Sequence, residues 1–164
     1  MIRTAVMSPC GLYRYSLTRE DDGMSFMSSD SGTVAFLLSN CSTADAVVDD
    51  RTITRCWNYA QGWGFRLMII VNCNPYRATD PKNAIIPPEH VMAENDTHIR
   101  FAAYAADMVV CAYGTITPPD LAARALGVLK CQKPLYYLAL SKDGVPKHPL
   151  YLPGELKPVL WSRS

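Results

Sequence analysis

The sequence predicts a single α/β domain over residues 1–164, built as a three-layer α/β/α sandwich around a central, mostly parallel sheet. Short apolar runs without strict alternation are typical of strands that are covered on both faces, as in parallel sheets. Segments with helical periodicity separate these runs, so the order strand, helix, strand repeats. With 49% hydrophobic and 19% charged residues, 164 residues suffice to enclose one core.

Four apolar runs are the expected parallel strands, at residues 33–39, 67–71, 108–112 and 135–139. Three segments between them, at 51–61, 94–107 and 118–130, are the expected helices. In the first helix Ile53, Cys56, Trp57 and Ala60 recur at i, i+3, i+4 and i+7, which makes one apolar stripe. The other two segments show the same spacing.

The two ends of the chain differ from this pattern. Residues 12–19 and 24–28 flank the sequence Glu20-Asp21-Asp22-Gly23, and an Asp-Gly pair between short segments predicts an antiparallel hairpin. We expect this hairpin at an edge of the sheet. Residues 145–164 are rich in proline and predict a loop that wraps back over the domain.

Composition narrows the classes of partner. The net charge is +1 and no run of five basic residues occurs, which does not favour long contacts with a nucleic-acid backbone. No apolar run is long enough for a membrane span, and residues 1–11 lack the apolar core of a signal peptide, so we expect a cytoplasmic protein without a membrane partner.

The six cysteines and three histidines do not predict a metal site. No two cysteines form a CxxC pair, and several lie in apolar stretches, so we interpret them as small buried hydrophobic residues. The histidines lack ligand spacing. We therefore expect no metal and no cofactor.

Polar residues follow each expected parallel strand, where open parallel sheets bind ligands. Asn40 and Asn72 come directly after the first two strands, and His148 follows the fourth. The site should therefore lie along one rim of the sheet. The other residues singled out at this rim are Ser42, Thr43, Asp45, Asp50, Arg55, Tyr76, Arg77, Tyr113 and Tyr151.

Structural interpretations of these residues stay open. Asn40 and Asn72 could cap the following turns, and Asp50 could be the N-cap of the helix that begins at Arg51. Arg55 could be a solvated side chain, and His148 could be structural. Their joint placement at one end of the sheet favours a functional role.

Three stretches resemble the family known as domain of unknown function 1643. They are residues 40–56, which contain Asn40-Cys41-Ser42-Thr43-Ala44-Asp45, residues 72–82, and Lys142 to Leu152. The resemblance runs from about residue 12 to the end of the chain. The chain departs from the family pattern at Cys41, where proline is usual, and at Tyr113, where tryptophan is usual.

The order of features is also similar to the uracil-DNA glycosylase superfamily. In that superfamily a first strand ends in a water-positioning Asp or Asn, a second ends in Asn, a third ends in Trp-Gly, and a His-Pro motif follows. The counterparts here are Asn40, Asn72, Tyr113-Gly114 and His148-Pro149. This resemblance implies a uracil-DNA-glycosylase-like sandwich.

The same resemblance implies roles for these residues. Asn40, with Asp45, would orient or activate a water, Asn72 would read the edge of a base, and His148 would face a developing negative charge. Since Asn cannot act as a general base, only Asp45 or another carboxylate could remove a proton. The remaining candidates are stacking platforms and phosphate or substrate contacts: Tyr76, Tyr113, Tyr151, Arg55, Arg77, Ser42, Thr43 and Asp50.

The sequence thus predicts a protein that recognises a nucleobase or nucleotide. Its chemistry would be hydrolysis of an N-glycosidic bond, and the alternative is a binding module that sequesters or senses a nucleotide-like molecule without turnover. Because the net charge is small, a free nucleotide fits at least as well as duplex DNA.

Overall fold

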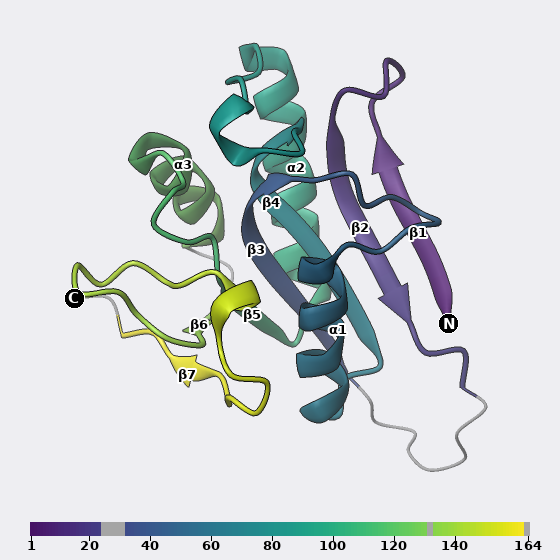
Figure 1. The fold of residues 1–164 in the computed structure, drawn as a ribbon, viewed down its shortest axis with the longest axis vertical. Coiled ribbons are helices and arrows are strands. Elements are labelled where there is room, and N and C mark those ends of the chain that lie inside the picture. Colours follow the sequence, from purple (N-terminus) through teal and green to yellow (C-terminus); the bar gives the residue numbers. More distant parts are fainter. Residues whose placement is uncertain (24–31, 131–132, 163–164) are drawn as a thin grey trace.

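The computed structural model describes residues 1–23, 32–130 and 133–162, and these form a mixed α/β fold with three helices and a seven-stranded sheet (Figure 1). The strand order is β1-β2-β4-β3-β5-β6-β7. The strands are β1 (Ile2–Met7), β2 (Arg14–Glu20), β3 (Thr33–Cys41), β4 (Leu67–Arg77), β5 (Met108–Cys111), β6 (Leu135–Tyr137) and β7 (Val159–Leu160). The helices are α1 (Arg51–Gly62), α2 (Glu89–Ala105) and α3 (Pro119–Leu129), with short 3-10 helices η1 (Pro81–Asn83) and η2 (Pro149–Tyr151).

The four predicted parallel strands are confirmed as β3, β4, β5 and β6, which pair in parallel in the middle of the sheet. β3 and β4 lie at its centre, and β4 extends beyond the predicted run to Arg77. The three predicted helices are confirmed as well, although α2 begins at Glu89, before the predicted start at residue 94.

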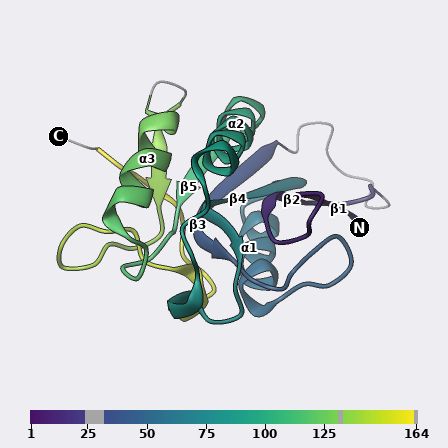
Figure 2. The same cartoon turned by 90° about the horizontal axis from the view of Figure 1, so that it is seen from above.

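Helices cover both faces of the sheet (Figure 2). The strand sequences predict this, because their apolar residues do not alternate with polar ones. On one face α1 packs over a core that includes Phe36, Ile70 and Val110. On the other face α2 and α3 cover a second core that includes Leu37, Val71 and Cys111. Successive residues of β3 and β4 therefore alternate between the two cores.

The predicted hairpin is wrong in its pairing. β2 pairs antiparallel with β1, through a turn that runs from Ser8 to Tyr13, and its Leu17–Glu20 end also pairs with β4. Because β1 and β4 occupy the two sides of β2 at Leu17–Glu20, this part of β2 cannot pair with a further strand. The predicted partner segment 24–28 lies outside the described residues. The antiparallel pair that stands at one edge of the sheet is β1 with β2.

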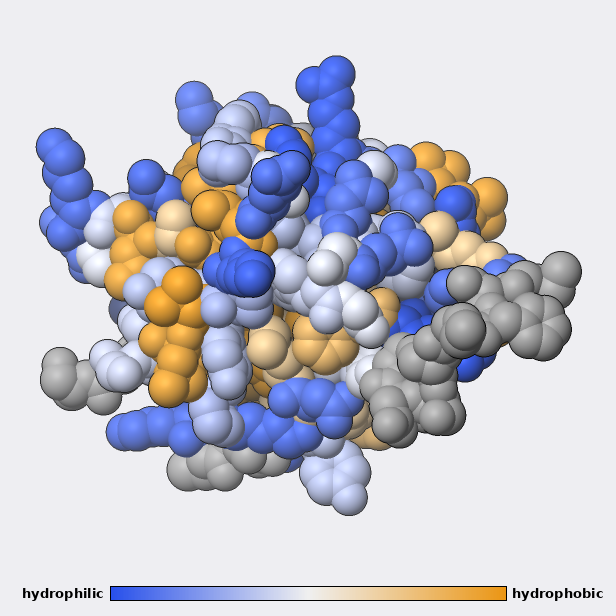
Figure 3. Space-filling view, turned by 90° about the horizontal axis from the view of Figure 1, so that it is seen from below, coloured by the Kyte–Doolittle hydropathy of each residue, from blue (hydrophilic) through white to orange (hydrophobic). Residues whose placement is uncertain are grey.

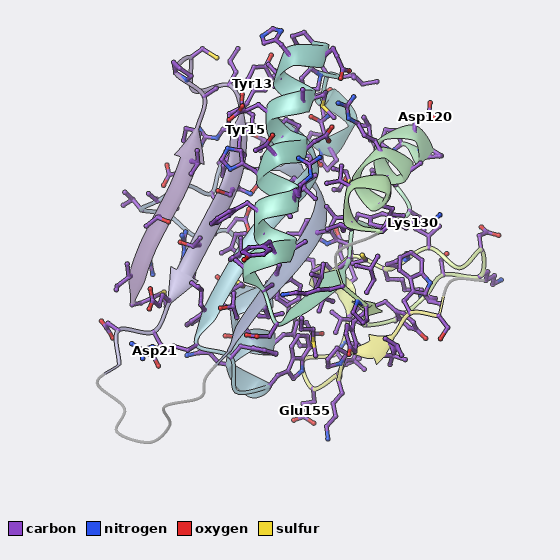
Figure 4. The ribbon with its side chains drawn as sticks, turned by 180° about the vertical axis from the view of Figure 1, so that it is seen from behind. Tyr13, Tyr15, Asp21, Asp120, Lys130 and Glu155 are labelled. Atoms are coloured by element: carbon purple, nitrogen blue, oxygen red, sulfur yellow. The ribbon has the colours of Figure 1, made fainter. Side chains whose placement is uncertain are left out.

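A β-bulge in β2 changes which way its side chains point. The register passes from Val6 opposite Ser16 to Met7 opposite Arg14, so Tyr15 is the extra residue. Tyr15 turns to the face of α2 and stacks on His98 with ring centroids 5.1 Å apart (Figure 4). Arg14 turns to the other face, on the side of α1, where its guanidinium reaches Asn72.

The C-terminal segment wraps over α1, as predicted, but it is not all loop. The Trp63 indole donates to the carbonyl of Leu156 (2.9 Å), and the Tyr59 hydroxyl donates to the carbonyl of Pro153. The segment also forms η2 and then β7, which adds to β6 as an antiparallel edge strand. A proline-rich composition does not reveal so short a strand.

The remaining surface has mixed character. Hydrophobic and hydrophilic side chains are interspersed at the edge where the parallel strands begin (Figure 3). In the part of the chain that the structure describes, no helix is long and apolar enough to cross a membrane. Four of the five described cysteines are buried, as predicted, whereas Cys10 is exposed.

Truncation of Phe36 tests the core between the sheet and α1. Phe36 is fully buried in β3, so Phe36→Ala should lower the free energy of unfolding by about 3–5 kcal/mol. Phe101→Ala is the matched control, because Phe101 is 66% exposed on α2, and it should change the value by only about 0.5 kcal/mol. Urea denaturation measures both. Equal effects would contradict the placement of β3.

Candidate functional site

A cavity of about 810 Å³ opens where the parallel strands end. Figure 2 looks onto this edge of the sheet. The end of β3, the middle of β4, the beginnings of β2 and α1, and the segments that follow β4, β5 and β6 enclose the cavity. The polar and charged lining residues are Arg14, Ser39, Asn40, Ser42, Asp50, Thr52, Asn72, Thr79, Thr115, Ser141, Lys142, Lys147, His148 and Tyr151.

Six of the twelve residues singled out from the sequence line this cavity: Asn40, Ser42, Asp50, Asn72, His148 and Tyr151. The other six do not: Thr43, Asp45, Arg55, Tyr76, Arg77 and Tyr113. The structure thus brings together Asn40, Asn72 and His148, the three residues most prominent in the sequence, although β4 continues past Asn72 to Arg77.

Asp45 serves the backbone of its own loop. Its carboxylate accepts hydrogen bonds from the amides of Val47 (2.8 Å) and Val48 (3.0 Å). These bonds favour the charged form and hold the pKa of Asp45 below its ordinary value. The geometry therefore gives Asp45 a turn-forming role.

The two arginines singled out from the sequence lie away from the cavity. Arg77 donates to the carbonyls of Thr43 (3.0 Å) and Gly11 (3.4 Å) and so ties two loops together. Arg55 lies on α1, with one guanidinium nitrogen against Gly154 of the C-terminal segment.

Two of the three tyrosines also lie outside the cavity. Tyr76 packs beside Tyr13, and Tyr113 is buried in the core under α3. Tyr151 lines the cavity and is 86% exposed, so it stands at the opening.

Asn72 is held on the inner wall of the cavity by three neighbours. Its Oδ1 accepts from Arg14 Nη2 (3.3 Å) and from the Cys41 thiol (3.2 Å). Its backbone carbonyl accepts from Asn95 Nδ2 of α2 (2.9 Å). Because a guanidinium can only donate, these contacts fix the amide oxygen toward Arg14. The side chain is 1% exposed, and its Nδ2 has no partner among the described residues.

Asp50 combines a structural role with a place in the site. One carboxylate oxygen accepts from the amide of Ile53 (2.8 Å), which confirms Asp50 as the N-cap of α1. The other oxygen accepts from the hydroxyl of Ser42. Among the residues that line the cavity, Asp50 is the one carboxylate. Asp50 is therefore the one carboxylate in the lining to which a ligand or a water could pass a proton.

His148 is held in one orientation. Its Nδ1 accepts a long hydrogen bond from the amide of Leu150 (3.4 Å) at the start of η2. Gly114 permits the close approach of this loop, since a Cβ there would lie 3.1 Å from the Cβ of His148. Burial lowers the pKa of His148, and the nearby Asp50 carboxylate offsets this only in part. The lowered pKa favours the neutral ring, and in the neutral ring a hydrogen bond accepted by Nδ1 leaves the proton on Nε2.

Arg14 is the buried charged residue of the cavity lining that was not singled out from the sequence. It is 1% exposed, lines the cavity, and donates to the carbonyl of Ala44 (2.6 Å) as well as to Asn72. Strict alternation along β2 would place it with Ser16, facing away from Leu17. The bulge at Tyr15 reverses this direction, and no periodicity in the sequence marks it.

The chain is thus an α/β protein with a cavity at the carboxyl ends of parallel strands, lined by amides, a histidine and the carboxylate that caps α1. A family model described as "Protein of unknown function (DUF1643)" matches residues 14–150, and the chain belongs to this family. The match confirms the resemblance seen in the sequence. No curated protein and no solved structure matches the chain.

The lowered pKa of His148 predicts a pH dependence of stability. Because the unfolded state takes up the proton first, stability is lost as the pH falls below the ordinary value of 6.5. In His148→Asn this loss should be smaller, since asparagine can still accept from the Leu150 amide but does not titrate. Urea midpoints at about pH 7.5 and about pH 5.5 measure the difference. Identical pH dependence in the two proteins would contradict a lowered pKa of His148.

Proposed function

We propose that this chain binds a nucleotide, or a related molecule with a nucleobase, in the cavity at the rim of the sheet, and hydrolyses its N-glycosidic bond. The observation that carries the proposal is that Asn40, Asn72 and His148, which lie far apart in the sequence, line one cavity. Their order along the chain is that of the uracil-DNA glycosylase superfamily, so we extend the proposal to a fold of that type.

The lining supports a ligand of this class. The cavity volume of about 810 Å³ is in the range of sites for small molecules, about 300–1,000 Å³. Amides of Asn40 and Asn72 offer hydrogen bonds, and Tyr151 offers an aromatic face at the opening. Arg14, Lys142 and Lys147 outnumber the single carboxylate of Asp50, which favours an anionic ligand.

The reaction needs a group that takes a proton from water, and the geometry favours Asp50 over Asp45. Water oxygen would form a bond to the anomeric carbon, the carbon–nitrogen bond would break, and its electron pair would leave with the base. Asn40 would orient the water, and a proton of this water would pass to Asp50. The Nε2–H of His148 would face the charge that develops on the base.

One observation favours the alternative, a site that binds the nucleotide without turnover. Both oxygens of Asp50 already accept hydrogen bonds, from Ile53 and Ser42, so the carboxylate is already engaged in holding α1 and the loop after β3. A protein of this kind would sequester or sense the nucleotide. Duplex nucleic acid is a weaker candidate ligand in either case, because the net charge is +1.

Asp50→Asn separates binding from turnover. Asparagine is as good an N-cap as aspartate, so the variant should fold with nearly unchanged stability. It should bind the same nucleotide as the original protein but release free base at least about 100-fold more slowly. Chromatography of reactions with a panel of nucleotides and base-modified DNA measures release, and calorimetry measures binding.

Two outcomes would decide against parts of this proposal. Tight binding of an intact nucleotide with no base released by the original protein would establish the non-catalytic alternative. Failure of every nucleotide to bind would overturn the proposed ligand class.

A further inference from the structure

The guanidinium of Arg14 carries a buried charge that no carboxylate neutralises. Among the ion pairs of the described residues none includes Arg14, although its side chain is 1% exposed. Its hydrogen bonds go to two neutral oxygens, those of Ala44 and the Asn72 amide. A buried ion without a counter-charge is costly, so its retention calls for an explanation.

Arg19 on the same strand shows how the fold treats a comparable side chain. Its side chain is fully buried as well, but Nη2 lies 2.6 Å from Oδ1 of Asp49 and Nε donates to the same oxygen (2.8 Å). β2 thus holds two buried arginines on the face of α1, one with a counter-ion and one beside an open cavity.

Cys41 does not supply the missing negative charge. Its Sγ donates to the carbonyl of Arg14 (3.1 Å) and to Asn72, so it acts as a thiol. Burial raises the pKa of this thiol in spite of the neighbouring guanidinium. The positive charge therefore remains uncompensated.

Two buried donors next to this charge have no partner. Nε of Arg14 and Nδ2 of Asn72 are both inaccessible and unpaired among the described residues, and both side chains line the cavity. Arg14 orients Asn72 so that the amide can offer only its NH₂ group. The inner wall thus holds two unsatisfied donors and a positive charge, which suit an anionic oxygen and do not suit a ligand amino group.

We propose that Arg14 Nε and Asn72 Nδ2 form the phosphate subsite of the cavity, so that a nucleoside monophosphate enters with its phosphate toward the inner wall and its base toward Tyr151 at the opening. This inference rests on the proposed nucleotide ligand. It gives Asn72 a phosphate contact in place of the base contact that the glycosylase resemblance implies. It also places the base beside His148, whose ring centroid lies 6.4 Å from that of Tyr151.

The test compares ligands that differ only in the phosphate. Melting temperatures are measured with a panel of nucleoside 5′-monophosphates, the corresponding nucleosides, and inorganic phosphate against sodium chloride of equal ionic strength. The subsite predicts that at least one monophosphate binds about tenfold or more tightly than its nucleoside, and that inorganic phosphate competes with it. Equal affinity of nucleoside and monophosphate, without competition by phosphate, would overturn the inference while the proposed function stands.

The variant Asn72→Asp makes the test specific to this wall. Aspartate has the same shape, keeps the acceptor for Arg14 and Cys41, loses no existing hydrogen bond of Nδ2, and supplies the missing counter-charge. Its melting temperature should equal or exceed that of the original protein, and its stabilisation by phosphate and by the monophosphate should disappear. Phosphate binding that survives in this variant would overturn the inference.

Asn74→Asp is the matched control, two residues further along β4. Asn74 is 5% exposed and outside the cavity lining, and its Nδ2 donates to the carbonyl of Ile85 (2.9 Å). Its replacement should lower the melting temperature and leave phosphate binding intact.

If phosphate binds through Asn72 but no nucleotide binds better than phosphate, the proposed function fails and the anion subsite stands.

Discussion

The buried guanidinium of Arg14 is the contact on which the site depends. Arg14 lies at the beginning of β2, and its guanidinium donates to Asn72 in the middle of β4 and to the carbonyl of Ala44 in the loop after β3. The backbone carbonyl of Arg14 accepts from the Cys41 thiol of β3. Three segments that are distant in sequence, around residues 14, 41–44 and 72, thus share one corner of the cavity. The same contact sets the orientation of the Asn72 amide and leaves a positive charge at the inner wall.

The sheet provides the frame for this corner. β3 and β4 pair in parallel with Leu38 opposite Asn72, so their polar ends emerge side by side. Alternation along the two strands directs Asn72 to the face that α1 covers, since its alternate neighbour Ile70 lies in the core under that helix. Asp50, which begins α1, therefore faces the same cavity that Asn72 closes from within. Fold and site follow from one feature, the parallel pairing of two strands buried on both faces.

The sequence predicted this frame well because apolar runs and helical periodicity are local signals. The parallel strands, the three helices and the rim that carries Asn40, Asn72 and His148 could all be read from such patterns. The hairpin could not, because an Asp-Gly pair marks a turn but does not choose between β1 and a later segment as the partner of β2. Arg14 was missed for a related reason, since a single bulge at Tyr15 reverses its direction and leaves no periodic trace. Asp45 was selected by its position after a strand, yet the backbone amides of its own loop engage its carboxylate.

A crystal structure of the chain with a bound nucleoside monophosphate tests the central claim most directly. We expect phosphate oxygens within hydrogen-bond distance of Arg14 Nε and Asn72 Nδ2, and the base stacked near Tyr151. A nucleotide bound outside the cavity, or one whose base edge rather than its phosphate meets Arg14 and Asn72, would contradict it.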